Sequence, residues 1–218
     1  MTIQHDPSRR RLLKWSGAGA TIAVSGVLLP NFGITAALAA DLGEGDIGVL
    51  NYAYALEQLE AAFYTQVIDT PYEGMSTDET ELLTDIRDHE VDHRDFLKGA
   101  LGEGAIPSLE VDFSAVDFSS RESVLNTAKT FEDLGVAAYN GAGKLIENVD
   151  YLAEAGRIVS VEARHAAVIR DLLQMNTVAF AGPDVVDGNG LDVAKEPAEV
   201  LGAAGPFIVS DVTANSLI

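Results

Sequence analysis

The sequence predicts an all-α protein: a four-helix bundle of two helical hairpins joined by one long crossover, followed by an irregular C-terminal tail. Three observations support this fold class. Four long segments carry apolar residues three and four positions apart, which is the spacing of one helix face. Two of these segments begin with a serine followed three residues later by a glutamate, the spacing of a capping box. A 17-residue segment between the second and third helices is long enough to connect opposite ends of a bundle.

The first hairpin is expected to consist of a helix over residues 46–69 and a second helix from Ser76 to the glycines at 102 and 104. Proline and glycine in the segment TPYEG (residues 70–74) separate the two. Ser76 and Glu79 have capping-box spacing. The apolar faces of the two helices are formed by Leu50, Tyr54, Ala61, Tyr64 and Ile68, and by Leu83, Ile86, Leu97 and Leu101.

The second hairpin is expected to begin after Ser119, which has capping-box spacing to Glu122, and to continue as a helix through Ile146. A fourth helix is expected over residues 149–175. The crossover before this hairpin, residues 103–119, reaches about 55 Å when extended. A helix of 25 residues is about 37 Å long, so the crossover can run the length of the bundle.

The chain is therefore divided into three parts: residues 1–39, a bundle over residues 40–176, and a tail over residues 177–218. The tail contains the polar, glycine-bearing run AGPDVVDGNG and the short apolar segment PAEVLGAAGPFIV (residues 197–209). We expect this apolar segment to pack back on the bundle. A subunit contact in a homo-oligomer is the alternative.

Residues 1–39 have the features of an export signal. A basic run, SRRRLLK (residues 8–14), precedes an apolar stretch over Trp15–Leu29 and an A-x-A cleavage motif at residues 37–39. The paired arginines are typical of the twin-arginine type. We expect export to the periplasm, the cell envelope or the medium, with cleavage after Ala39 or Ala40. An uncleaved signal anchor and a basic tail are the alternatives. The apolar stretch is short and glycine-rich, so no stable membrane insertion is expected after cleavage.

Charge and cysteine content exclude several classes of function. Removing residues 1–39 takes away four basic residues and one acidic residue, so the formal net charge changes from −20 to −23. Such a surface repels nucleic acid and anionic lipid. The chain has no cysteine, which excludes disulfides, thiolate zinc sites and cysteine-ligated iron–sulfur clusters. Any bound metal must be held by carboxylates and imidazoles.

An internal repeat relates the two hairpins. Each contains a glutamate, a tyrosine seven residues later, and a Glu-x-x-His motif 33 or 30 residues after that glutamate. These residues are Glu57, Tyr64, Glu90 and His93 in the first hairpin, and Glu132, Tyr139, Glu162 and His165 in the second. All four glutamates interrupt apolar stripes near the middle of their helices. The repeat therefore predicts four inward-facing carboxylates at one level of the bundle.

Four buried carboxylates require compensating positive charge, because burying even one unpaired carboxylate costs several kcal/mol. Two divalent cations supply four positive charges, and the two histidines complete the coordination. A glutamate from each of two helices plus Glu-x-x-His from each of the other two is a carboxylate-bridged di-metal arrangement. Carboxylate and imidazole ligands without thiolate suit iron or manganese. The predicted ligands are Glu57, Glu90, His93, Glu132, Glu162 and His165, with Glu90 and Glu162 bridging.

The segment His89-Glu90-Val91-Asp92-His93 also matches the H-E-x-x-H signature of zinc proteases. We reject that interpretation because no metzincin extension follows His93, and the second repeat has Val161 at the position matching His89. His89 is interpreted as a flanking residue near Phe96, with a role behind the ligands as the alternative.

Two further points stay open. Glu60 lies one turn after Glu57 on another apolar stripe and is an alternative ligand; Glu57 is preferred because it has the Glu-to-Tyr spacing of the repeat. Tyr64 and Tyr139 are interpreted either as core residues or as hydrogen-bond donors to the ligands.

Four segments resemble the ferritin-like, desiccation-related protein family: LNYAYALEQLEAAFY, DHEVDHRDFLKGAL, FEDLGVAAYNGA and VEARHAAVIRDLL. The resemblance covers roughly residues 46–209. It implies a ferritin-like fold and the same six metal ligands, but it implies no single activity.

Three functions are compatible with these features. The first is an oxidoreductase acting on O₂ or peroxide, as a ferroxidase, a peroxidase or a manganese-catalase-like enzyme. The second is a non-catalytic, metal-binding protein of the cell envelope that protects against stress. The third is a metal-free bundle that serves stress tolerance, desiccation tolerance or assembly through its surface. Cage-type iron storage is not expected, because the tail shows no fifth long helix.

Overall fold

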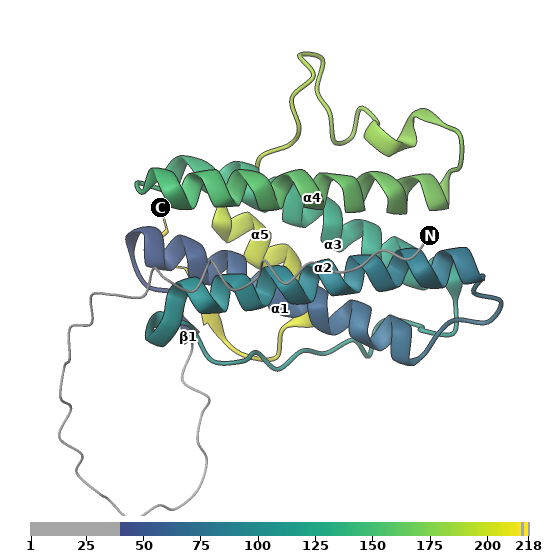
Figure 1. The fold of residues 1–218 in the computed structure, drawn as a ribbon, viewed down its shortest axis with the longest axis horizontal. Coiled ribbons are helices and arrows are strands. Elements are labelled where there is room, and N and C mark those ends of the chain that lie inside the picture. The colour runs from purple at the N-terminus through teal and green to yellow at the C-terminus, as the bar shows by residue number, and fades with distance from the viewer. Residues whose placement is uncertain (1–39, 215, 218) are drawn as a thin grey trace, which may run out of the picture. The chain divides into compact units, whose positions relative to one another are not determined.

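The computed structural model describes residues 40–214 and 216–217, so the expected export signal at residues 1–39 lies outside the described residues. Four long helices dominate: α1 Gly45–Asp69, α2 Thr77–Leu101, α3 Arg121–Ala142 and α4 Val149–Leu173. α1 packs against α2 and α3 packs against α4, as two hairpins (Figure 1). The predicted all-α bundle is confirmed. Among the described residues, no helix is both long and apolar enough to cross a membrane.

The helix boundaries follow from local hydrogen bonding. At Ser76 the predicted capping box is present, with the serine hydroxyl accepting from the Glu79 backbone N–H. At α3 the predicted cap is wrong by one residue: Ser120 caps the helix, because Ser119 hydrogen-bonds to Asp117 instead. The third and fourth helices are also shorter than predicted and end at residues 142 and 173. After α3 the chain tightens into the 3₁₀ turn η4 Gly143–Leu145.

α1 is the central helix. Every residue from Gly48 to Ala61 is buried, because α2, α3 and the crossover cover different sides of it. A helix that is mostly apolar around its whole circumference is stable only where it is enclosed in this way. The position of α1 therefore places Glu57 in the interior of the bundle.

The crossover leaves α2 through the 3₁₀ turn η3 Gly102–Gly104 and runs along the bundle to the start of α3 (Figure 1). Asn51 attaches it to α1: its amide donates to the carbonyls of Leu42 and Gly104, and its oxygen accepts from the Ile106 N–H. Aromatic rings of the crossover and of the elements that it covers pack together, most of them edge to face. This cluster contains Phe63, Phe113, Phe118, Phe131 and Phe207.

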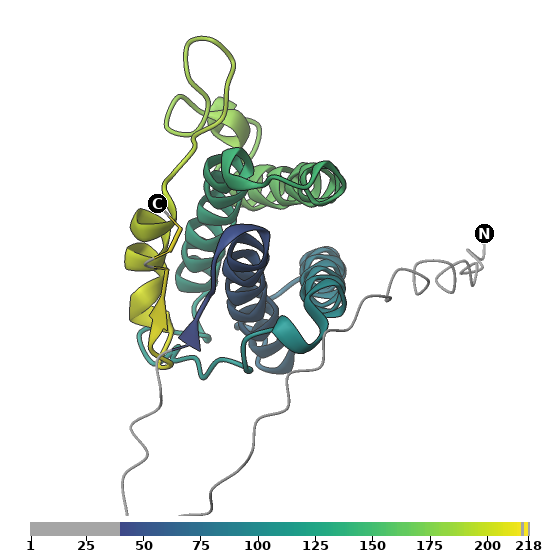
Figure 2. The ribbon, with the colours of Figure 1, turned by 90° about the vertical axis from the view of Figure 1, so that its left-hand side faces the viewer.

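The C-terminal tail packs on the outer side of α3, where α5 Pro197–Ala204 and the 3₁₀ turn η6 Gly205–Phe207 lie (Figure 2). The Lys195 N–H donates to the Ala137 carbonyl at 3.0 Å. Gly141 permits this approach, because a Cβ there would lie 1.8 Å from the Lys195 carbonyl oxygen. At the end of the tail, β2 Val212–Thr213 pairs in parallel with β1 Ala40–Asp41.

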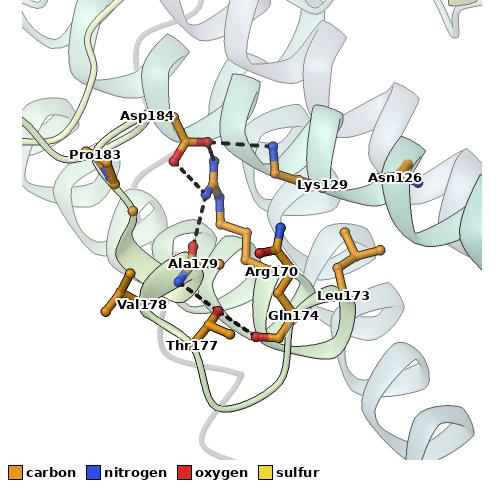
Figure 3. Close-up of a pocket in the computed structure, with 11 residues that line it drawn as sticks. Asn126, Lys129, Arg170, Leu173, Gln174, Thr177, Val178, Ala179, Pro183 and Asp184 are labelled. Carbon is orange, nitrogen blue, oxygen red and sulfur yellow. Dashed lines mark hydrogen bonds and ion pairs between the residues drawn. The ribbon is translucent and has the colours of Figure 1, made fainter.

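The segment between α4 and α5 is fastened by Arg170, which is 3% exposed (Figure 3). Its guanidinium donates twice to Asp133 of α3, twice to Asp184, and once to the Ala179 carbonyl in the 3₁₀ turn η5 Val178–Ala181. A polar pocket opens beside this cluster, between Lys129 and the η5 segment. All five N–H donors of Arg170 are bound within the protein, so its guanidinium has no donor left for a ligand in this pocket. We therefore assign Arg170 a structural role.

Candidate metal centre

The structure places the six predicted ligands together inside the bundle, and each of the four long helices contributes. Glu57 comes from α1, Glu90 and His93 from α2, Glu132 from α3, and Glu162 and His165 from α4. The four glutamates are 0% exposed. They lie on the faces that point inward, as the interrupted apolar stripes predicted.

The ligating atoms form two groups, and within each group all of them lie within 4.8 Å of one another. The first group consists of Glu57, Glu90, His93 and Glu162; the second consists of Glu90, Glu132, Glu162 and His165. Glu90 and Glu162 belong to both groups. This sharing is the arrangement expected of two metal positions bridged by two carboxylates.

The internal contacts of the cluster follow the repeat. The His93 Nδ1 lies 2.8 Å from Oε1 of Glu162, and the His165 Nδ1 lies 2.7 Å from Oε1 of Glu90. Each histidine is thus directed, through Nδ1, at the shared glutamate of the other hairpin. The two halves of the centre are related in the same way as the two halves of the sequence.

The polar atoms of the cluster are not satisfied by the protein. Eight of them are buried and have no hydrogen bond of acceptable geometry, although they lie near one another. They are Oε2 of Glu57, both oxygens of Glu90, Oε2 of Glu132, both oxygens of Glu162, and Nδ1 of His93 and His165. Buried polar atoms nearly always have partners. Converging, unpaired carboxylate oxygens and imidazole nitrogens fit a pair of divalent cations.

Burial and mutual repulsion shift the pKa values of these groups. Burial raises the pKa of Glu162 well above its usual range, and the charge of Glu90 adds to the effect. Burial also raises the pKa of Glu57 to about 7. Burial alone would raise the pKa of Glu90 too, but the close imidazoles of His165 and His93 lower it to about 2. Without metal the cluster therefore retains protons, which metal binding must displace.

Two tyrosines hold the outer carboxylates by donating across the hairpins. The Tyr64 hydroxyl donates to Oε1 of Glu132 at 2.5 Å, and the Tyr139 hydroxyl donates to Oε1 of Glu57 at 2.6 Å. Of the two interpretations of these tyrosines, the structure supports donation to the ligands. Each bond leaves the second carboxylate oxygen free to face the centre.

Glu60, the alternative to Glu57, lies beside the centre but belongs to neither ligand group. It is 3% exposed, and burial and the charge of Glu162 raise its pKa well above the usual range. Gly135 makes room for its carboxylate, because a Cβ there would lie 3.1 Å from Oε1 of Glu60. The helical spacing could not separate Glu57 from Glu60, since both faces of α1 are buried.

His89 lies behind one of the two histidines of the cluster. Its Nδ1 lies 3.0 Å from Nε2 of His165, and the two ring planes are nearly parallel, with centroids 5.2 Å apart. Of the two interpretations of His89, a flanking position near Phe96 and a role behind the ligands, this contact supports the second, because the rotation of α2 directs position 89 toward α4. His89 touches the back of a ligand and is not in either ligand group, contrary to what the zinc protease signature requires.

Comparison with known proteins agrees with this geometry. A family model described as the ferritin-like domain matches residues 45–175, which include all four long helices. A search of curated proteins found no significant match.

Proposed function

The chain belongs to the ferritin-like domain family, and from this we propose that it is an exported di-metal protein that carries out redox chemistry on O₂ or peroxide. The observation that supports the proposal is the convergence of eight buried, unpaired ligand atoms in two groups that share Glu90 and Glu162.

The residues present fit two divalent ions. Four glutamates offer four negative charges, and two histidines offer neutral nitrogens once their Nδ1 protons are displaced. When bound, a pair of iron or manganese ions supplies two-electron redox chemistry toward O₂ or peroxide. The protein's part is to fix the ligands: Tyr64 and Tyr139 orient the two outer carboxylates, and the bundle holds the bridging pair.

The burial of the centre limits what can react there. The four glutamates are 0% exposed, and the side chains of His93 and His165 are 12% and 5% exposed. An enclosed site of this kind favours small reactants such as O₂ or peroxide. Ferroxidase, peroxidase and catalase-like activities therefore come before chemistry on larger organic substrates.

Export is the second part of the proposal, and it is supported by the sequence SRRRLLK and the A-x-A motif. The twin-arginine route carries folded proteins, so the ions could be bound before export. Replacing Arg9 and Arg10 with lysine should keep the protein inside the cell. The N-terminus of the exported form should be Ala40 or Asp41, as found by N-terminal sequencing.

Metal analysis tests the centre itself. Protein purified from its native compartment should contain two equivalents of iron or manganese, and a Glu90→Ala/Glu162→Ala variant should contain none. A matched control, Glu81→Ala/Glu147→Ala, replaces two exposed glutamates and should retain both equivalents.

Activity assays then separate the candidate functions. Rapid Fe(II) oxidation by O₂, or disproportionation of peroxide to water and O₂, would identify an oxidoreductase. Bound metal without turnover would instead support a non-catalytic role in envelope stress protection. A folded protein that takes up no metal would contradict the proposal and leave the metal-free stress-tolerance or desiccation function.

A further inference from the structure

His165 uses its two ring nitrogens in opposite directions. Nδ1 points into the cluster, 2.7 Å from Oε1 of Glu90, and Nε2 points away from it, 3.0 Å from Nδ1 of His89. His89 lies on α2 immediately before Glu90, and its side chain is exposed. The two rings are nearly parallel, with an interplanar angle of 9°. His165 is therefore held from behind by a second imidazole.

The other half of the centre lacks this arrangement. Val161 occupies the position in the second repeat that matches His89, and its side chain cannot accept a hydrogen bond. Within the described residues, no hydrogen bond joins Nε2 of His93 to a partner. His93 is also the more exposed of the two ligand histidines, with 12% of its side chain accessible against 5% for His165. The two repeats therefore contain the same ligands, but they differ in the residue that contacts the ligand histidine on the side away from the centre.

A metal-binding imidazole must present a lone pair to the ion and carry its proton on the other nitrogen. In His165 the proton must then be on Nε2, which can donate it to the lone pair on Nδ1 of His89. Such a bond fixes both the tautomer and the orientation of the ring. His93 must adopt the equivalent tautomer without a partner of this kind. Ordering its ring on metal binding therefore costs more free energy than ordering the ring of His165.

We propose that His89 is a positioning residue that makes the two metal positions unequal, so that the group containing Glu132 and His165 binds its ion more tightly and fills first. This inference rests on the proposed di-metal function and adds an order of occupancy to it. His89 acts through His165 and does not itself contact either ion.

Three proteins test this by Mn(II) titration, followed by calorimetry and by the EPR signal of bound manganese. They are the wild type, His89→Phe and His89→Gln. Phenylalanine keeps a planar ring but removes the acceptor, whereas the glutamine side-chain oxygen can still accept from Nε2 of His165. In His89→Phe, one of the two equivalents should bind about 10–100-fold more weakly, and the other should be unchanged. His89→Gln should recover most of the lost affinity.

The outcomes separate this inference from the function on which it rests. If the wild type binds no manganese, both fail. If the wild type binds two equivalents and His89→Phe binds them equally well, or weakens both together, only the positioning role of His89 is overturned. Failure of His89→Gln to improve on His89→Phe would overturn it too. If His89→Phe does not fold, ¹⁵N NMR of the zinc-loaded wild type decides: a His165 ring without a proton on Nε2 would refute the proposal.

Discussion

The hydroxyl of Tyr64, in the first hairpin, donates to Oε1 of Glu132, in the second hairpin, at a distance of 2.5 Å. The Tyr139 hydroxyl makes the reciprocal bond to Glu57. The two hairpins are therefore connected at the level of the centre by their own outer ligands. Positioning of the carboxylates and association of the hairpins depend on the same two hydrogen bonds.

Replacing Tyr64 with phenylalanine should weaken metal binding without unfolding the protein. The buried ring remains, but Oε1 of Glu132 loses its donor, and loss of such a partner typically lowers metal affinity about 10–100-fold. Calorimetric titration with Mn(II) measures the change. Tyr52→Phe is the matched control, because the Tyr52 hydroxyl is buried and has no hydrogen-bond partner. Equal affinities for the two variants would contradict the role assigned to Tyr64.

The fold was predictable from the sequence because each helix carries its own periodic signal and each break its own proline, glycine or serine. The ligand set was predictable because two glutamate-containing stripes recur with Glu-x-x-His at nearly the same spacing. Glutamates interrupt the apolar stripes of both hairpins in the same order. This repetition indicates that they lie together in the interior.

Other features depend on how the helices are rotated against each other, and a single helix does not encode that. His89 lies one residue before a ligand on an exposed face, so periodicity alone made it a flanking residue. Glu60 is buried because α1 is covered on all sides, which follows from tertiary packing. The pairing of Ala40 with Val212 involves strands of two residues, too short to show alternation.

Glu60 should make the metal-free protein less stable as the pH rises. Burial first, and then repulsion from Glu162, raise its pKa well above 4.5. A raised pKa in the folded state means that the stability it contributes is fully present below about pH 4.5 and is lost as the pH rises through the folded-state value. The loss is at most about 1.4 kcal/mol for each pH unit.

Glu60→Gln removes this titration, so the metal-free variant should gain stability over the wild type progressively as the pH rises from about 4.5 to the folded-state pKa of Glu60. Urea denaturation in the presence of a chelator measures the difference. Glu81→Gln, on an exposed face of α2, should follow the wild type at every pH. A constant difference between Glu60→Gln and the wild type across this range would show that Glu60 does not titrate as described.

Gly141→Ala should loosen the tail from α3. The added Cβ would lie 1.8 Å from the Lys195 carbonyl oxygen, and that backbone is tied to α3 by the bond from Lys195 N–H to the Ala137 carbonyl. Overpacking of this kind costs about 1–3 kcal/mol. Gly156→Ala is the control: nothing lies within 4 Å of its Cβ position, and alanine in a helix interior should stabilise by roughly 0.5–1 kcal/mol. Urea denaturation should therefore shift in opposite directions for the two variants.

Removing the metal should destabilise the wild type but not a variant without the bridging carboxylates. Ions that bind the folded state alone stabilise it by mass action, by about 2.7 kcal/mol at a concentration 100 times the dissociation constant. Without them, the four glutamates at 0% exposure are left with unpaired oxygens. In Glu90→Gln/Glu162→Gln, two of these carboxylates become neutral amides. Adding Mn(II) to this variant after metal removal should therefore change its stability little.

Denaturation curves with and without Mn(II) measure both differences. Because the formal net charge is −20, Mn(II) can also stabilise the protein by binding weakly to its acidic surface. Salt suppresses this weak binding. The comparison should therefore be made at about 0.15 M salt. If Mn(II) stabilises the wild type and the double variant equally under these conditions, the stabilisation comes from the acidic surface and the enclosed centre contributes nothing to it.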